Sequence, residues 1–182
     1  AAKLAKDPVP FLAHAKQFEG LDPTYVRSLF GGVQSALRAK TTFDWQPVLE
    51  LAAWVVQQPR DIPGREGGLM VTDPDWGWTR DSILDLLTAG FDLQQPGHLP
   101  YELHPLVWRV LQPLTEDPNP SSEDEGGGKF DPGSRSINST RGRAMHAVLE
   151  FARWRRLLTD PERKTEKKPL LTFEEMPEDR KS

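Results

Sequence analysis

Hydrophobic residues recur at intervals of three and four along much of the chain, the spacing of an amphipathic helix. The pattern is clearest after Asp22-Pro23, where it runs from Val26 to Leu37. Six helices are predicted in this way, over residues 8–18, 23–39, 45–57, 79–89, 100–114 and 139–158. No segment shows the alternation of period two that is typical of a strand. The pattern therefore predicts an all-α fold.

Residues that typically begin or end helices support these boundaries. Asp-Pro pairs at Asp7, Asp22 and Asp73 precede apolar patterns and predict helix starts, because Asp caps free N–H groups and Pro fits the first helical position. The pair at Asp117 lies in polar sequence and predicts a turn. Asp44 is the expected cap of the helix over 45–57. Gly20 and Gly90 are expected to end the first and fourth helices.

Two of the helices have distinctive apolar faces. The helix over 45–57 has apolar residues on two sides, including Leu51 and Trp54, which predicts packing between neighbours. The last helix carries a stripe flanked by Phe151, Trp154 and Leu158, and we expect this stripe to be its main apolar face. The stripe consists of Met145, Val148, Leu149 and Ala152.

The order of helices predicts three antiparallel hairpins. They pair 8–18 with 23–39, 45–57 with 79–89, and 100–114 with 139–158. The first helices of the first two hairpins begin about 37 residues apart, within the range of two-helix solenoid repeats, whereas the next spacing is about 55. We therefore expect a HEAT-like or armadillo-like α-solenoid over residues 1–158, interrupted by long loops at 58–75 and 117–137, the second one mobile. Residues 159–182 read as a charged tail with one apolar stretch at 169–173.

Composition narrows the class of protein. The 182 residues include 23 Lys and Arg against 27 Asp and Glu, a net charge of −4, which argues against a strongly basic nucleic-acid binder. Residues 153–168 hold seven basic and three acidic side chains, but acidic residues follow, so a solvated tail is favoured over a nucleic-acid site. The absence of Cys excludes disulfides, thiolate catalysis and Cys-based zinc sites. No apolar run could span a membrane and no secretory signal begins the chain, so we expect a cytoplasmic location.

The first candidate site is the cluster of Trp76, Trp78 and Arg80. Tryptophan and arginine are the residues most enriched in binding hot spots, so this cluster could contact a protein partner. The alternative is structural: the indoles close the second hairpin over its core, and Arg80 pairs with Asp81 or Asp85.

The second candidate site is the entry to the last helix, with Asn138, Arg141 and Arg143 beside Ser139 and Thr140. A helix N-terminus with arginines could hold a phosphate or a nucleotide. The alternative is helix packing, with Arg141 paired to the acidic loop upstream. No Walker motif is present to favour a nucleotide.

Signals for catalysis and metal binding are weak. His98, Glu102 and His104 lie close in sequence but lack the spacing of a zinc-binding helix. No serine stands in a nucleophile elbow. We therefore expect no catalytic residue, no metal and no cofactor.

Residues 73–80 and 137–145 carry a resemblance to a known kind of protein. These two segments have the sequences DPDWGWTR and INSTRGRAM. In them the chain resembles the helical region of very large bacterial multidomain proteins. These are STAND-like signal-transducing NTPases linked to antiphage defence, in which a nucleotide-binding module precedes a helical sensor array. The resemblance implies a sensor or scaffold segment of a larger protein, without catalytic residues of its own.

The sequence thus predicts a non-catalytic helical scaffold that binds a protein partner or neighbouring domains. The positions expected to make that contact are Trp76, Trp78, Arg80, Asn138, Arg141 and Arg143. The alternative is a small phosphate-binding or nucleotide-binding helical module that uses residues 138–143.

Overall fold

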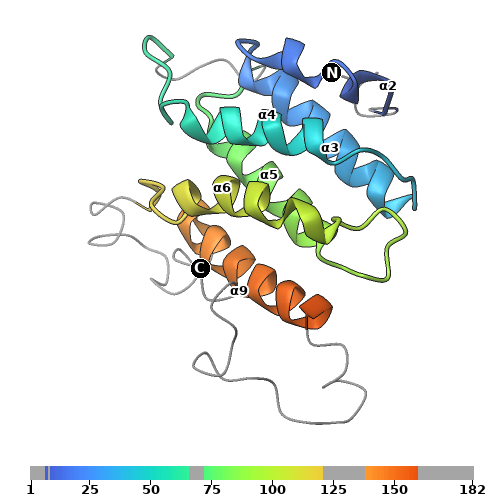
Figure 1. Ribbon diagram of the computed structural model, residues 1–182. Coiled ribbons are helices and arrows are strands. Elements are labelled where there is room, and N and C mark those ends of the chain that lie inside the picture. Colours follow the sequence, from blue (N-terminus) through green and yellow to red (C-terminus); the bar gives the residue numbers. More distant parts are fainter. Residues whose placement is uncertain (1–6, 8, 66–71, 121–137, 160–182) are drawn as a thin grey trace.

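A computed structural model describes residues 7, 9–65, 72–120 and 138–159, and within them the chain is helical (Figure 1). The described part contains no strand, only an isolated antiparallel bridge between Asp61 and Asp75. The all-α class is therefore confirmed. The elements are α2 (Val9–Leu12), η1 (Ala15–Phe18), α3 (Pro23–Arg38), α4 (Gln46–Gln57), α5 (Gly77–Gly90), η2 (Tyr101–Leu103), α6 (His104–Leu114) and α9 (Thr140–Thr159). The predicted loop beyond residue 120 and the predicted tail beyond residue 159 lie outside the described residues.

The helices form two layers. In one layer α3 packs on α5 and α5 on α9, and in the other η1 packs on α4 and α4 on α6. Figure 1 shows α3, α5 and α9 running in one direction and α4 and α6 in the other. The layers meet where α9 contacts α6 and where α5 contacts α4 and α6. The most extensive packing therefore joins each helix to the next but one along the chain. None of these described helices is both long and apolar enough to cross a bilayer.

Aspartate side chains fix the helix starts much as the sequence predicts. Asp22 accepts a hydrogen bond from the Thr24 N–H at 2.9 Å, and Asp44 accepts one from the Gln46 N–H at 2.9 Å. At α5 the prediction was wrong in detail, because Asp75 rather than Asp73 accepts from the first helical N–H, at 2.7 Å.

The first predicted helix is broken. Residues 8–18 form the short helix α2 and the 3₁₀ turn η1 instead of one helix. After η1 the chain turns at Gly20, whose φ of 81° lies in the left-handed region that favours glycine. The predicted stop at Gly20 is therefore confirmed, while the continuous helix before it is not.

Buried side chains from both layers form one core. Both sides of α4 are buried, as the sequence predicts for a helix between neighbours. The Trp45 indole is central: its Nε1 donates to the Gly97 carbonyl at 2.8 Å, and its ring lies against Gly90. A Cβ at Gly90 would lie only 2.7 Å from the Trp45 ring. Gly90 thus ends α5 as predicted, and the close approach of the ring requires a glycine there.

The main correction concerns α9. Its buried residues are Thr140, Ala144, Ala147, Phe151 and Trp154, and of the predicted stripe Val148 is half-buried against the core. In that stripe Met145 is 55% exposed and Leu149 is 69% exposed. The two alanines allow α9 to approach α5 closely, while Phe151 and Trp154 fill the space beside Phe91. Size and shape, rather than the length of the apolar stripe, decide which face is buried.

Candidate functional site

The starts of α3, α5 and α9 meet at one end of the molecule, together with the segments that follow α4 and α6. Hydrogen bonds join them: the Thr79 hydroxyl donates to the Pro23 carbonyl at 3.2 Å, and the Thr140 hydroxyl donates to the Asp81 carboxylate at 2.8 Å. We call this region the polar end and define it by its buried polar groups. They are Asp73, Thr79, Arg80, Asp117, Ser139 and Thr140, and the partly exposed Arg60 lies beside them.

Asp117 is the centre of the polar end and only 1% exposed. One of its carboxylate oxygens accepts from Arg60 Nη1 at 2.7 Å, and the other accepts from Arg80 Nη1 at 2.6 Å. Arg80 also donates through Nη2 to the Gln58 carbonyl at 2.6 Å. The expectation that Arg80 pairs with Asp81 or Asp85 was therefore wrong. Two guanidinium groups around one buried carboxylate hold the ends of α4, α5 and α6 together.

The entry to α9 is already occupied by protein groups. The N–H of Thr140 donates to Asn119 Oδ1 at 3.2 Å, and the N–H of Arg141 donates to the Asn119 carbonyl at 3.0 Å. Ser139 caps the helix by accepting from the Gly142 N–H at 3.0 Å. The free N–H groups that a phosphate would need at a helix start therefore have partners here.

The two arginines of this cluster also have protein partners. Arg143 forms an ion pair with Asp85 at 3.0 Å, and Arg141 donates from Nη2 to the Pro120 carbonyl at 3.0 Å. Asn138 lies exposed just before the helix. The acidic loop upstream was expected to pair with Arg141, and its residues 121–137 lie outside the described residues.

Two carboxylates at this end have pKa values that differ from the usual value of an aspartate. Burial raises the pKa of Asp81, although the Thr140 hydrogen bond and the charges of Arg143 and Arg60 oppose that rise. At Asp22 burial also acts to raise the pKa, but hydrogen bonds from Arg65 and Thr24 outweigh it and lower the pKa.

The two tryptophans of the first cluster have different surroundings. Trp76 is 7% exposed, and its ring meets that of Trp54 edge-on with 5.5 Å between centroids. Trp78, two positions later along the helix, is 53% exposed. Trp76 therefore belongs to the core, as the structural alternative predicts, while Trp78 is available at the surface.

The Trp78 ring contacts the side chain of Arg27, which is held in place by other residues. The guanidinium of Arg27 lies 5.5 Å from the centre of the Trp78 ring, within cation–π range. Arg27 binds both oxygens of the buried Asp73 carboxylate, with Nε at 2.7 Å and Nη2 at 2.8 Å. The Asp73 backbone is held in turn by Thr24 and Arg65, at 2.8 and 3.0 Å. We call Trp78 and Arg27 together the Trp78 surface.

Other exposed apolar side chains lie near the Trp78 surface along the chain. Leu21 and Tyr25, at the start of α3, are both more than a third exposed. The start of α3 is joined to α5 through the bond between Pro23 and Thr79. This end of the molecule therefore combines a buried polar framework with accessible aromatic side chains.

Sequence reasoning found some of these residues and missed others. It identified Trp78 and Arg80 as candidate residues. It missed Arg27 and Asp73, which support Trp78, and Asp117, which binds Arg80. The Asp-Pro pair at 117 was correctly interpreted as a turn, in which the carboxylate accepts from the Asn119 N–H at 2.9 Å. Its arginine partners lie 37 and 57 positions away, so no local spacing could reveal them.

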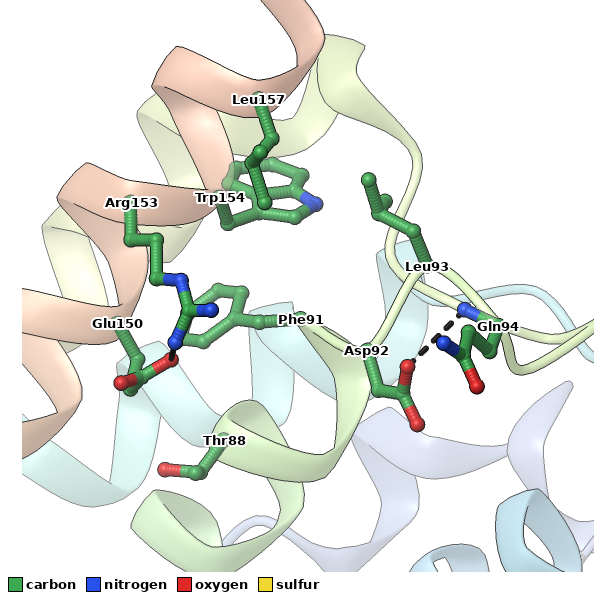
Figure 2. Close-up of a pocket in the computed structure, with 9 residues that line it drawn as sticks. All are labelled: Thr88, Phe91, Asp92, Leu93, Gln94, Glu150, Arg153, Trp154 and Leu157. Atoms are coloured by element: carbon green, nitrogen blue, oxygen red, sulfur yellow. Dashed lines mark hydrogen bonds and ion pairs between the residues drawn. The ribbon is translucent and has the colours of Figure 1, made fainter. Parts of the chain in front are cut away.

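A separate cavity lies between the end of α5 and α9, with a volume of about 510 Å³. Phe91, Leu93, Trp154 and Leu157 form its apolar part (Figure 2). Its charged side chains are engaged locally: Arg153 pairs with Glu150 at 3.8 Å, and Asp92 accepts from the Gln94 N–H at 3.0 Å. None of the sequence-predicted site residues lines this cavity.

Metal-ligand side chains do not gather in the described part of the chain, where no group of three could hold an ion. His98 and His104 each bond a nearby backbone carbonyl, of Leu99 and Tyr101, at 3.0 and 2.9 Å. Comparison with known proteins adds no assignment, because no family model, no curated protein and no solved structure matches the chain.

Proposed function

We propose that this chain is a non-catalytic helical scaffold that binds a protein partner through the Trp78 surface. The observation that carries the proposal is a tryptophan, half-exposed at the start of α5, supported from behind by an arginine that is itself fixed to a buried carboxylate. Such a side chain offers a large apolar area to a partner. Trp and Arg are the residues that dominate binding energy at protein interfaces.

The rigidity of the Trp78 surface favours binding. A partner that contacts a mobile side chain loses part of the interaction energy in ordering it, about 0.5–1.5 kcal/mol per side chain. Arg27 is held by two hydrogen bonds to Asp73, so its position under the Trp78 ring is set before any partner arrives. The cost of ordering this pair on binding is correspondingly small.

The proposed setting is a helical array in a larger protein. The two layers, in which each helix packs mainly on the next but one, are consistent with a HEAT-like or armadillo-like α-solenoid. In this proposal the chain is a sensor or scaffold segment of a cytoplasmic bacterial protein, of the kind found in STAND-like NTPases of antiphage defence. The partner is then either a neighbouring domain of that protein or a separate chain.

A phosphate-binding or nucleotide-binding module at residues 138–143 has less support. The N–H groups of Thr140, Arg141 and Gly142 already have protein acceptors. A titration with ATP tests this alternative: saturable binding that is lost in Arg141→Ala, with an unchanged helical circular dichroism spectrum, would replace the scaffold proposal.

The proposal is tested by site-specific photo-crosslinking in the native host. Benzoylphenylalanine replaces Trp78 in one variant and Glu50, an exposed position on α4, in the matched control. We expect a discrete protein adduct at position 78 that the control lacks. The identified partner should then bind Trp78→Ala at least about tenfold more weakly than wild type. The same adducts at both positions, or wild-type affinity of Trp78→Ala, would contradict the proposal.

A further inference from the structure

The cavity between the end of α5 and α9 contains a buried hydrogen-bond donor that the protein leaves unused. Trp154 lines this cavity and is 1% exposed. Its indole Nε1 has no hydrogen-bond acceptor among the residues that the structure describes. Figure 2 shows this nitrogen on the edge of the ring that faces Leu93 across the open space of the cavity. Buried polar groups in folded proteins nearly always have a partner, so this unpaired N–H needs an explanation.

A comparison with Trp45 shows how this chain satisfies another buried indole. Trp45 is equally buried, and its Nε1 donates to the Gly97 carbonyl at 2.8 Å. Around Trp154 the fold supplies aromatic contacts instead. The rings of Phe91 and Tyr101 lie 5.4 and 5.9 Å from the Trp154 ring, centroid to centroid. These contacts hold the indole in one orientation, with its N–H directed toward the cavity.

Water satisfies an N–H poorly in such surroundings, because a buried water molecule needs two to four polar partners. The side chains drawn on the nitrogen side of the Trp154 ring in Figure 2 are apolar, those of Leu93 and Leu157. A water beside Nε1 would therefore have the indole as its main polar neighbour. A molecule that carries an oxygen acceptor on an apolar body fits these surroundings better.

The cavity is large enough for such a molecule. Its volume of about 510 Å³ lies within the range of ~300–1,000 Å³ that is typical of small-ligand pockets. Ligand pockets also combine a mainly apolar lining with a few polar groups that fix the orientation of the ligand. Here Phe91, Leu93 and Leu157 offer the apolar surface, and Trp154 Nε1 offers the orienting donor.

The charges around the cavity favour a neutral ligand. Asp92 and Glu150 contribute carboxylates to the lining and Arg153 contributes a guanidinium, so negative groups outnumber positive ones. An anionic ligand is disfavoured by this excess of negative charge. A cationic ammonium group has no acceptor for the Trp154 hydrogen bond. A neutral molecule with a carbonyl oxygen meets both conditions.

We propose that this cavity binds a small, neutral and mainly apolar molecule whose carbonyl oxygen accepts a hydrogen bond from Trp154 Nε1. The site is separate from the Trp78 surface, because Trp78 lies in the first turn of α5 and Phe91 directly follows the last residue of that helix. Ligand binding here therefore stands or falls independently of the proposed partner binding.

The test uses three probes of nearly the same size and shape with the full chain. Acetophenone is neutral and has a carbonyl acceptor, benzoate is an anion, and α-methylbenzylammonium is a cation without an acceptor. Binding is followed through the indole N–H signals in proton–nitrogen correlation spectra of isotopically labelled protein. Trp154→Phe identifies the Trp154 signal by its loss, and through-bond assignment identifies it if that variant does not fold.

We expect acetophenone to move the Trp154 indole proton signal downfield in a saturable way and to leave the Trp78 signal in place. Its affinity should exceed that of each other probe by about tenfold, because acetophenone alone pairs the buried N–H without bringing a charge into the cavity. An unmoved Trp154 signal up to the solubility limit of acetophenone would overturn the proposal. Equal or tighter binding of benzoate or of the ammonium probe would overturn it too.

A pair of variants assigns the effect to the cavity. Leu157→Trp places an additional indole in the space that the probe needs and should abolish the shift. Ala152→Trp is the matched control, since Ala152 is an exposed position of the same helix that does not line the cavity. That variant should bind acetophenone as the wild type does. Unchanged binding in Leu157→Trp, or equal loss in both variants, would overturn the proposal.

Discussion

At the scale of single residues, Asp117 has the strongest effect on the structure. Its carboxylate is buried and lies between two arginines from distant parts of the sequence, Arg60 and Arg80. A buried ion pair contributes little net stability over an apolar core, but removing one partner leaves an uncompensated charge in the interior. Arg60 also pairs with the partly exposed Asp75 at 3.7 Å, whereas Arg80 pairs with the buried Asp117.

Asp117→Asn should therefore lower the free energy of unfolding by about 3–5 kcal/mol, because the buried Arg80 loses its carboxylate partner and Arg60 loses the nearer of its two carboxylate partners. Urea denaturation at neutral pH measures the change. Asp85→Asn is the matched control, since Asp85 pairs with Arg143 at the surface and both side chains are more than a third exposed. That variant should lose no more than about 1 kcal/mol. Equal losses in the two variants would show that the Asp117 network is not buried.

Asp81 leads to a prediction about pH. Because burial raises its pKa in the folded state, the folded form holds the proton more tightly than the unfolded chain. Ionisation of Asp81 then costs stability, and this cost is absent at acid pH and present above the raised pKa. Asp81→Asn keeps an oxygen for the Thr140 hydroxyl and avoids the cost. The free energy of unfolding in urea, taken as Asp81→Asn minus wild type, should therefore be more positive at pH 7 than at pH 3.

Asp22 is the control with the opposite sign. Its pKa is lowered in the folded state, so it contributes stability above its unfolded pKa and loses that contribution as the pH falls. Asp22→Asn can still cap α3 but should be less stable than wild type at pH 7, with the difference shrinking toward pH 3. If both variants changed with pH in the same direction, the environments assigned to these two carboxylates would be wrong.

At the scale of elements, the sequence predicts helices well and their buried faces less well. The starts of α3 and α4 follow from Asp22 and Asp44, because capping is a local interaction. The buried face of α9 could not be predicted, because the helix has apolar residues on two sides. Only the neighbours α5 and α6 decide that Ala144 and Trp154, rather than Met145 and Leu149, are buried.

A pair of glycines tests how tightly the elements pack. Gly90→Ala should destabilise the protein by about 1–3 kcal/mol, because the new methyl group would lie 2.7 Å from the Trp45 ring. Gly31→Ala, on α3, meets nothing within 4 Å. It should stabilise the protein by up to about 1 kcal/mol through helix propensity. Thermal unfolding of both variants measures the contrast, and a stabilising effect of Gly90→Ala would contradict the close packing.

At the scale of the whole molecule, the fold brings together two candidate sites that lie far apart in the sequence. The clusters around Trp78 and Arg141 were predicted as separate sites, yet Asp81 and Thr140 join them at the polar end. The sequence could name aromatic and basic residues as candidates, because their types are informative alone. It could not show that Arg80 is internal, since the position of Asp117 depends on how α5 and α6 pack.

The central claim is that Trp78 is a surface residue placed on a rigid framework, while its neighbour Trp76 belongs to the core. Urea unfolding of Trp76→Ala and Trp78→Ala tests this claim most directly, without any knowledge of the partner. Trp76→Ala should lose about 3–5 kcal/mol of unfolding free energy, as expected for a buried aromatic side chain. Trp78→Ala should lose no more than about 1 kcal/mol, the range of a cation–π contact at an exposed site. A loss at Trp78 as large as that at Trp76 would place both indoles in the core and contradict the account.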